Sequence, residues 1–188
     1  MDEEALRNAG EEYERLYGGA AFYDIALEIA DTYPLQASII ILATWNTGRF
    51  RYLMANNAQN LASLRTVIKE CKSLFEKVKN KEFQTTNFDE IGDCVKRIYL
   101  KLSKVNGVEY TGASKIMHLL NPQLFLIWDT AMRKHYGYYH ANGNEYLKYH
   151  KRVQKDVQSV KWHSHAKTLL KAIDEYHYIT ITRKRKLP

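Results

Sequence analysis

Asp129 stands at a position where a carboxylate can do chemistry. It follows an uninterrupted apolar run, Leu124–Trp128, and begins a segment with helical spacing. A carboxylate held there can stabilise positive charge at a reacting centre or activate a water molecule. The same position suits an acidic helix cap, because Asp accepts hydrogen bonds from the first amides of a helix. The two roles are compatible, so Asp129 is the first candidate catalytic residue.

Basic side chains are concentrated in the last quarter of the chain. Residues 145–188 contain eleven Lys and Arg against four Asp and Glu, so this segment carries the whole net charge of +7. Such asymmetry is typical of proteins that bind polyanions. A solvated, solubilising face is the alternative interpretation. Four of these residues recur at spacings of three and four and would form a phosphate track on one side of a helix: Lys148, Lys151, Arg152 and Lys155.

The composition disfavours several classes of protein. The spacing of Cys71 and Cys94 fits neither a zinc site nor an iron–sulfur cluster, and no His-Glu-x-x-His pattern occurs, so we expect no metal and no cofactor. The longest uncharged apolar stretch, Ala37–Trp45, is far shorter than the roughly 20 residues of a membrane helix. Together with the acidic N-terminus, these features predict an intracellular protein that does not bind membranes.

The elements that must position these side chains are helices. Apolar residues recur at spacings of three and four through most of the chain, and only three prolines occur. This pattern predicts an all-α fold over residues 1–188, as a single helical domain or as two small lobes around a cleft. A basic tail is expected over residues 183–188. The predicted helices span residues 2–17, 20–32, 35–46, 58–79, 87–104, 111–120, 130–137, 143–158 and 161–177.

Residues 99–134 are the most informative segment. A helix is expected to end near Val105, and Asn106-Gly107-Val108 then forms a short turn. Thr111 is a favourable N-cap residue, which predicts that the next helix begins there. His118 lies off the apolar stripe of that helix and is predicted to be exposed. The segment therefore reads as a helix, a hairpin and a second helix.

This segment resembles the helix-hairpin-helix DNA glycosylase superfamily, which includes endonuclease III and the adenine glycosylases. The family pattern is a helix, a Gly-Val-Gly hairpin, a helix that begins with a Thr-Ala pair, and an Asp-Thr at the start of the next helix. Here Gly107-Val108 match the hairpin, Ala113 matches the alanine, and Asp129-Thr130 match the Asp-Thr. The step from Ala113 to Asp129 agrees with the family spacing. The resemblance is firm within residues 99–134 and weak elsewhere.

The resemblance implies a two-lobed helical architecture and duplex DNA as the partner, held by its phosphates. It implies that Asp129 is the carboxylate that assists cleavage of the N-glycosidic bond of an extruded base. It places Trp45 where many members have a residue that fills the gap left by the flipped base. The other residues expected at the DNA are Asn106, Gly107, Val108, Thr111 and Gly112 of the hairpin, with Arg133 and Lys134 on the following helix.

The chain departs from the family pattern at two positions of the hairpin. Glu109 stands where the family has glycine, in a turn that can require positive φ, and its carboxylate would repel phosphate. Thr111 replaces the lysine that forms a Schiff base in bifunctional members. Lys115 lies one helical turn further along the same face and is the second candidate catalytic residue. No cysteine quartet follows the core, so no iron–sulfur cluster is expected.

We therefore expect a DNA-binding glycosylase that hydrolyses the bond to a damaged base, located in the cytoplasm or associated with the nucleoid. One alternative is a catalytically inactive helix-hairpin-helix module that binds nucleic acid. Another is a helical protein-interaction domain that does not bind DNA. Asp129 favours the enzyme, whereas Glu109 and Thr111 favour the inactive module.

Overall fold

The computed structural model describes residues 1–18, 20–164 and 167–184. In these ranges the chain is helical and contains no β-strand, which confirms the all-α prediction. Residues 185–188 of the expected basic tail lie outside the described residues. The helices are α1 (Glu3–Tyr17), α2 (Ala21–Ile29), α3 (Pro34–Trp45), α4 (Thr47–Ala55), α5 (Asn57–Val78), α6 (Phe88–Ser103), α7 (Glu109–Leu120), α8 (Thr130–His135), α9 (Gly143–Asp156) and α10 (Leu169–His177), followed by a π-helical turn, η1 (Tyr178–Thr182).

Most predicted helices form near their expected boundaries, but two begin elsewhere and one helix was not predicted. The sequence pattern missed α4, which has no sustained apolar stripe and buries only Leu53 fully. The last helix was expected from residue 161 and begins at Leu169, where Thr168 caps it by accepting a hydrogen bond from the Lys171 amide at 3.1 Å. Helix α7 begins at Glu109, so Thr111 lies inside its first turn and is not the N-cap.

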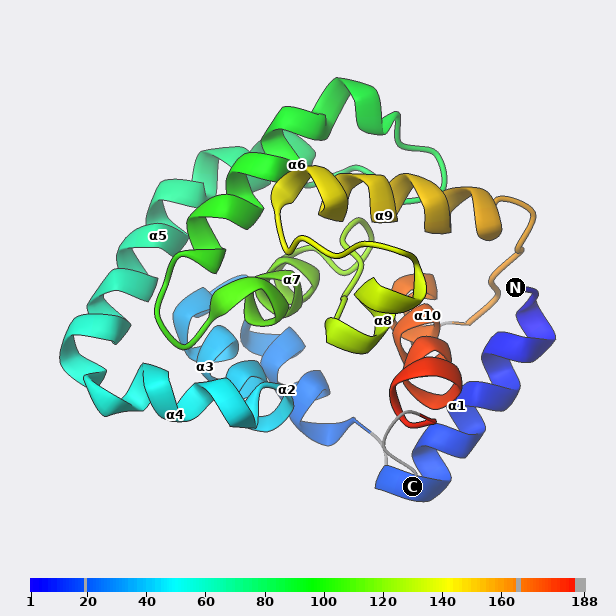
Figure 1. Cartoon of the computed structure of the whole chain (residues 1–188), viewed down its shortest axis with the longest axis horizontal. Helices are drawn as coiled ribbons and strands as arrows, with labels where there is room; N and C mark the ends of the chain where they lie inside the picture. Colours follow the sequence, from blue (N-terminus) through cyan, green and yellow to red (C-terminus); the bar gives the residue numbers. More distant parts are fainter. Residues whose placement is uncertain (19, 165–166, 185–188) are drawn as a thin grey trace.

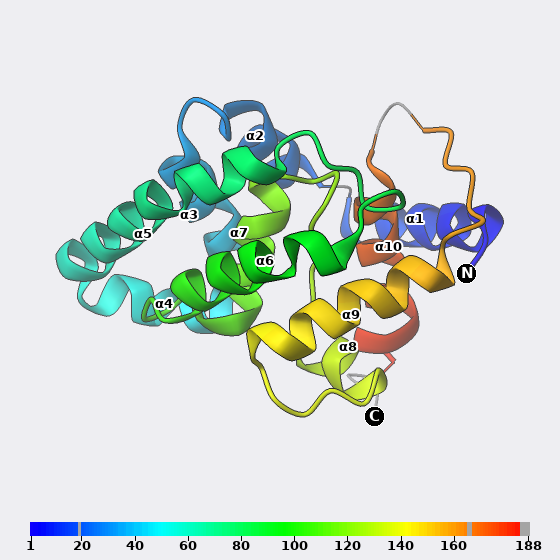
Figure 2. The same cartoon turned by 90° about the horizontal axis from the view of Figure 1, so that it is seen from above.

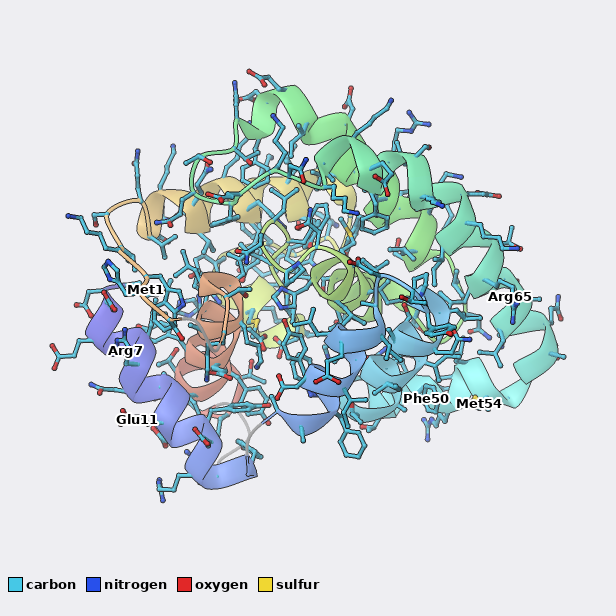
Figure 3. All side chains as sticks on the ribbon, turned by 180° about the vertical axis from the view of Figure 1, so that it is seen from behind. Met1, Arg7, Glu11, Phe50, Met54 and Arg65 are labelled. Atoms are coloured by element: carbon cyan, nitrogen blue, oxygen red, sulfur yellow. The ribbon has the colours of Figure 1, made fainter. Side chains whose placement is uncertain are left out.

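The helices form two groups around a shared interior (Figure 1). In the first group, α7 packs against α2, α3 and α6, and α5 packs against α6. In the second, α1 packs against α10, and η1 continues α10 and contacts α8. Helix α9 lies along α6, as Figure 2 shows from above. Seen from behind, α1 with Met1, Arg7 and Glu11 lies at one end of the molecule, and Phe50, Met54 and Arg65 lie at the other (Figure 3).

A continuous apolar core joins the two groups. It includes Leu6 of α1, Ile41 of α3, Ile98 of α6 and Ile173 of α10, each at most 1% exposed. Burial of one such aliphatic side chain contributes roughly 1.5–3 kcal/mol to the free energy of unfolding. The two groups of helices are therefore connected by packing as well as by the chain.

His118 was predicted to be exposed, and this prediction was wrong. Its side chain is fully buried in the middle of α7, where Nδ1 donates to the Phe125 carbonyl at 2.8 Å and Nε2 accepts from the Tyr23 hydroxyl at 3.0 Å. Helix α7 is covered by α2, α3 and α6, so a residue off its apolar stripe also meets protein. The apolar periodicity of one helix does not report how many neighbours surround it.

No helix in the described part of the chain has both the length and the apolar character that a membrane span requires.

Candidate active site

The turn between α6 and α7 is a tight hairpin in which two residues have positive φ. Gly107 has φ +82° and Glu109 has φ +53°. The Val108 and Glu109 amides both donate to the Val105 carbonyl, at 3.0 and 3.3 Å. A Cβ atom on Gly107 would lie 2.2 Å from the Leu53 backbone nitrogen, so glycine is required there for space as well as for conformation.

The φ of Glu109 confirms that this turn position adopts the left-handed conformation, which glycine adopts without strain. A residue with a Cβ atom loses roughly 1–2 kcal/mol in that region of φ and ψ. The Glu109 carboxylate forms an ion pair with Arg49 at the start of α4, at 3.2 Å, so its negative charge is partly compensated. The hairpin is thus tied to α4 by this ion pair and by the close approach of Gly107 to Leu53.

A cleft of about 840 Å³ lies where the hairpin, α8 and the second helical group meet. This volume is in the range of pockets that hold small organic ligands, roughly 300–1,000 Å³. Its walls consist of Thr44–Arg49 at the α3–α4 junction, Val108–Thr111 and Lys115 of the hairpin and α7, Ile127 and Asp129–Met132 around the start of α8, Tyr13 and Tyr17 of α1, Asp174 of α10, and Tyr178 and Thr182 of η1.

Asp129 lies half-buried in this cleft and also caps α8. Its Oδ1 accepts a hydrogen bond from the Met132 amide at 2.8 Å, and its Oδ2 accepts one from the Thr182 hydroxyl at 2.8 Å. Thr182 comes from η1, so the carboxylate connects α8 to the C-terminal part of the described chain. The cap and the cleft position coexist, as the sequence suggested, and both carboxylate oxygens are held in fixed directions.

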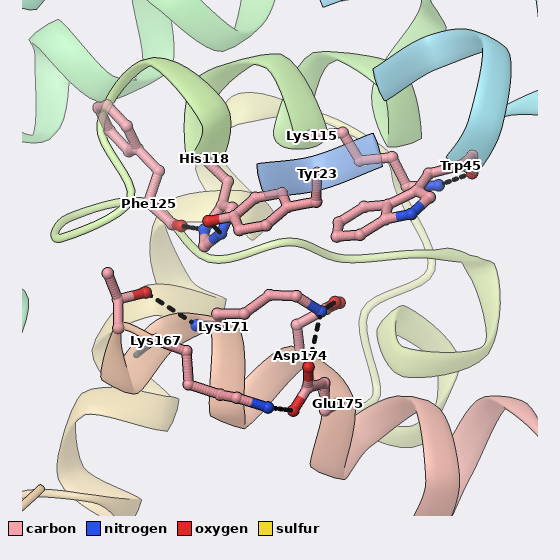
Figure 4. Close-up of polar contacts among 10 residues, drawn as sticks. Tyr23, Trp45, Lys115, His118, Phe125, Lys167, Lys171, Asp174 and Glu175 are labelled. Carbon is pink, nitrogen blue, oxygen red and sulfur yellow. Dashed lines mark hydrogen bonds and ion pairs between the residues drawn. The ribbon is translucent and has the colours of Figure 1, made fainter. Parts of the chain in front are cut away.

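Lys115 projects into the same cleft from α7. Its Nζ donates a hydrogen bond to the Trp45 carbonyl at the end of α3 (Figure 4). Thr111, one turn earlier on α7, also lines the cleft. The structure therefore brings Asp129, Lys115 and Trp45 to one cavity, although they come from three separate parts of the sequence.

Trp45 forms part of the cleft wall and is packed on its other side. Its ring stacks on Tyr23 with a centroid distance of 5.2 Å and an interplanar angle of 5°. The Lys171 ammonium lies 4.6 Å from the Trp45 ring centroid. These contacts hold the indole as a fixed surface of the cavity, with its backbone carbonyl anchored by Lys115.

Three tyrosines form an aromatic cluster in the cleft that the sequence analysis missed. Tyr13 lies 5.1 Å from Tyr17 and 5.7 Å from Tyr178 between ring centroids, and Tyr17 lies 5.5 Å from Tyr178. Aromatic rings in a cleft can stack on the faces of nucleobases. Because α1 and η1 are at opposite ends of the chain, the sequence had no local signal for this cluster.

Asp174 on α10 also places a carboxylate in the cleft, in addition to Glu109 and Asp129, and the sequence analysis did not identify it. Its side chain is 12% exposed, and its Oδ2 lies 3.6 Å from the Lys171 ammonium. Burial raises the pKa of Asp174, whereas Lys171 and Lys115 act in the opposite direction. The i, i+3 and i+4 spacing of Lys171, Asp174 and Glu175 was visible in the sequence, but it indicated only ion pairs on a helix.

Lys171 is the cation that holds this wall of the cleft together. It is only 1% exposed and lies 3.1 Å from Glu175, which also pairs with Lys167 at 2.8 Å (Figure 4). The rings of Tyr13, Tyr23 and Trp45 surround its ammonium at 4.6–5.5 Å. A buried ammonium is tolerated only with such compensation.

Several residues expected at the DNA are buried. Gly107, Val108 and Gly112 are buried, although Val108 also forms part of the cleft wall. The Asn46 amide donates to the carbonyls of Gly107 and Val108 at 3.4 and 3.3 Å. A Cβ atom on Gly112 would lie 2.9 Å from Asn46 and from Leu42. These three residues therefore shape the hairpin backbone and pack α7 against α3, whereas Asn106 is exposed at the turn.

Arg133 differs from its expected role as a surface contact to DNA. It is 7% exposed, its guanidinium donates to the Tyr139 carbonyl at 2.6 Å, and it lies 5.1 Å from the Tyr110 ring centroid. These contacts support the loop after α8, so the sequence assigned Arg133 wrongly to the surface. Its neighbour Lys134 is exposed. Helical spacing alone does not predict that Arg133 is buried and Lys134 exposed, because it contains no information about the loop that folds back over Arg133.

The basic residues of α9 share one side of that helix, as predicted. Lys148, Arg152 and Lys155 are exposed, and Lys151 is half-buried. Lys151 pairs with Asp89 of α6, and Arg152 pairs with Asp156 at 3.4 Å. Helix α9 contributes no residue to the cleft, so these charges form a surface separate from it.

The described residues contain no cluster of His, Cys, Asp and Glu side chains placed to hold a metal ion. Comparison of the chain with protein-family models, with curated protein sequences and with solved structures finds no significant match. The geometry of the cleft and the local resemblance of residues 99–134 are therefore the features that point to a function.

Proposed function

We propose that this chain is a DNA-binding protein of helix-hairpin-helix glycosylase architecture that hydrolyses the N-glycosidic bond of a base extruded into the cleft. The observation that carries the proposal is the convergence of Asp129, the α6–α7 hairpin and an aromatic-lined cavity of about 840 Å³. An enzyme that acts on a base must take it out of the duplex and needs a pocket of this kind. The hairpin at the edge of the cavity would hold the phosphate backbone beside it.

Asp129 would assist the breaking of the bond between the sugar C1′ and the base. The bonding electrons leave with the base, and positive charge develops on the sugar ring. The Asp129 carboxylate stabilises this charge and accepts a proton from the water that adds to C1′. The hydrogen bonds from Met132 and Thr182 keep the carboxylate oriented while it acts. The departing base then takes up this proton, which regenerates the carboxylate, and the products are a free base and an abasic site.

Hydrolysis without strand cleavage fits this cleft better than lyase chemistry. Thr111 occupies the position of the lysine nucleophile of bifunctional family members, and the Lys115 amine is engaged with the Trp45 carbonyl. A lysine that donates a hydrogen bond as an ammonium is not a nucleophile. Lys115 would instead contribute positive charge at the cavity wall.

The exposed basic side of α9 supports binding to the phosphate backbone. Lys148, Arg152 and Lys155 face solvent there, and Lys151 lies beside them. Contacts of this kind are independent of base sequence and weaken steeply as salt rises. We propose that the protein acts where its DNA substrate is, inside the cell and on the nucleoid.

A catalytically inactive module that binds nucleic acid is the second candidate. Two observations favour it: both oxygens of Asp129 already accept hydrogen bonds, and Glu109 places a carboxylate at the hairpin. A carboxylate near the expected phosphate weakens binding by like-charge repulsion. This candidate keeps the fold and the basic surface but removes no base.

The two candidates differ in an excision assay. Duplexes that carry uracil, 8-oxoguanine, an alkylated purine or thymine glycol are incubated with the protein and then treated with alkali, which cleaves the strand at abasic sites. The glycosylase proposal predicts cleavage at one or more lesions. Salt-sensitive binding of the same duplexes without cleavage would support the inactive module. Absence of both cleavage and binding would overturn both candidates.

A further inference from the structure

One cation at the edge of the cleft has no part in the proposed hydrolysis. Arg49 lines the cavity from the first turn of α4, and its side chain is 51% exposed. The other Lys or Arg among the described residues that line the cleft is Lys115, which is half-buried and donates to the Trp45 carbonyl. Arg49 is therefore the more accessible of the two cleft cations.

Arg49 belongs to a short basic strip on α4, which also contains Arg51 and Tyr52. Helix α4 contains these two arginines and no Asp or Glu. The guanidinium groups of Arg49 and Arg51 lie 5.7 and 4.8 Å from the Tyr52 ring centroid, and all three side chains are exposed. The Asn46 side chain does not cap the start of α4, so the positive end of the helix dipole adds to this charge. The strip is a positive surface beside the cleft, although residues 1–144 carry no net charge.

The Glu109 carboxylate of the hairpin pairs with this strip. Its Oε2 lies 3.2 Å from the Arg49 Nε, and its side chain is 31% exposed. The hairpin and α4 lie side by side in both views of the fold (Figures 1 and 2). An ion pair between two partly exposed side chains contributes less stability than the positive φ of Glu109 costs. Stability therefore gives no reason for a glutamate here, and strained residues are concentrated at ligand clamps and switch regions.

We infer that Arg49 binds the phosphate group beside the extruded nucleotide, and that Glu109 occupies its guanidinium until DNA displaces the carboxylate. The inference rests on the proposed function, because it takes DNA to be the partner at the cleft. A guanidinium binds carboxylate and phosphate with the same planar fork, so a phosphate can replace Glu109 at Arg49. Because the Glu109 side chain is partly exposed, the released carboxylate can turn into water.

This exchange differs from simple repulsion in its prediction for two substitutions made together. If Glu109 competes for Arg49, removal of the carboxylate strengthens DNA binding only while Arg49 is present. If Glu109 merely repels the phosphate, its removal strengthens binding at least as much without Arg49, because the carboxylate then has no counter-charge. A double-mutant cycle therefore separates the two mechanisms.

Fluorescence anisotropy with a labelled duplex that carries one abasic analogue measures this cycle, since the duplex offers an unstacked site but no base to excise. Arg49→Gln should weaken binding about fivefold at low salt and flatten the slope of log affinity against log salt by about 1. Glu109→Gln should strengthen binding about threefold in the natural chain but less than about 1.5-fold in the Arg49→Gln background. Unchanged affinity in Arg49→Gln, or a gain from Glu109→Gln that is as large without Arg49 as with it, would overturn the inference.

Arg65→Gln is the matched control for the loss of charge. Arg65 is exposed, lies at the same end of the molecule as α4 and does not line the cleft (Figure 3). An affinity loss as large as that of Arg49→Gln would attribute the effect to net charge and remove the specific contact. Glutamine is close in size to both replaced side chains, and thermal unfolding of each variant verifies that the fold persists.

The binding cycle and the excision assay fail independently. Excision by the natural chain, with unchanged duplex affinity in Arg49→Gln, would leave the glycosylase proposal standing and remove the Arg49 contact. The predicted cycle without excision at any lesion would keep the contact and favour the inactive binding module. Absence of duplex binding by the natural chain would overturn the inference and the proposed function together.

Discussion

Three histidines of the described residues are buried without a counter-charge, and mild acid should therefore destabilise the fold. His118, His150 and His177 are each at most 1% exposed. Burial lowers the pKa of His118 and of His150 from 6.5 to about 4, and that of His177 to about 3. The unfolded chain thus binds protons at a higher pH than the folded chain. Their contribution to stability is complete above about pH 6.5 and is lost as the pH falls toward 4.

The hydrogen bonds explain why protonation is unfavourable in the folded state. His150 accepts from the Leu126 amide through Nε2 at 3.0 Å and donates to the Tyr146 carbonyl through Nδ1 at 2.9 Å. Protonation of Nε2 would place two N–H groups against each other in a dry interior. A histidine whose pKa is lowered from 6.5 to about 4 makes the free energy of unfolding about 2 kcal/mol smaller at pH 5 than at pH 7. The three histidines together should therefore lower it by about 6 kcal/mol.

Urea unfolding at pH 7 and at pH 5 measures this loss. His150→Gln should lower the free energy of unfolding at both pH values, because the ring leaves a gap, but its decrease between pH 7 and pH 5 should be about 2 kcal/mol smaller than that of the natural chain. His140→Gln is the matched control, since His140 is exposed and its replacement should leave the pH dependence unchanged. An equal decrease in His150→Gln and in the natural chain would refute the reasoning.

Three other substitutions test the hairpin and the basic surface. Gly107→Ala should reduce the free energy of unfolding by about 3 kcal/mol or more, because the new Cβ atom would meet the Leu53 backbone at positive φ; Gly18→Ala, with no atom within 4 Å, should cost only about 1 kcal/mol in the same denaturation experiment. Glu109→Gly should bind duplex DNA severalfold more tightly at low salt, since it removes a carboxylate. Its stability should change little, because the relief of the positive φ is offset by the lost ion pair with Arg49 and by the larger conformational entropy that glycine loses on folding. Equal affinity in fluorescence anisotropy would place the hairpin away from the phosphates. The double variant Lys151→Glu, Arg152→Glu should weaken binding to all sequences alike and flatten the slope of log affinity against log salt by about 2; an unchanged slope would show that DNA binds another face.

The sequence predicted the parts of the site that depend on local signals. The hairpin after Val105 and the cap at Asp129 were expected from the Asn106–Val108 turn and from the acidic residue ahead of a helix, and the structure has both. Lys115 reached the same cavity as Asp129 because helical periodicity fixes the face on which it lies. Each of these features is encoded within one turn or one helix.

The remaining parts depend on packing between distant segments. Tyr13 and Tyr178 meet only because α1 packs against α10 and η1, and Asp174 reaches the cleft through the same contact. His118 and Arg133 carry polar side chains that suggested exposure, yet neighbouring elements cover both and satisfy most of their hydrogen bonds. A polar residue at a helical position does not indicate whether another element covers it.

Replacement of Asp129 by Asn tests the central claim most directly. Asn caps a helix as well as Asp does, so the hydrogen bond from the Met132 amide and the fold should persist, which thermal unfolding can verify. The variant is incubated with whichever lesion duplex the natural chain cleaves, under single-turnover conditions, and its duplex affinity is measured in parallel. The proposed mechanism predicts that excision is lost while binding stays nearly unchanged. Excision at an unchanged rate in folded Asp129→Asn would contradict it and remove this carboxylate from the chemistry.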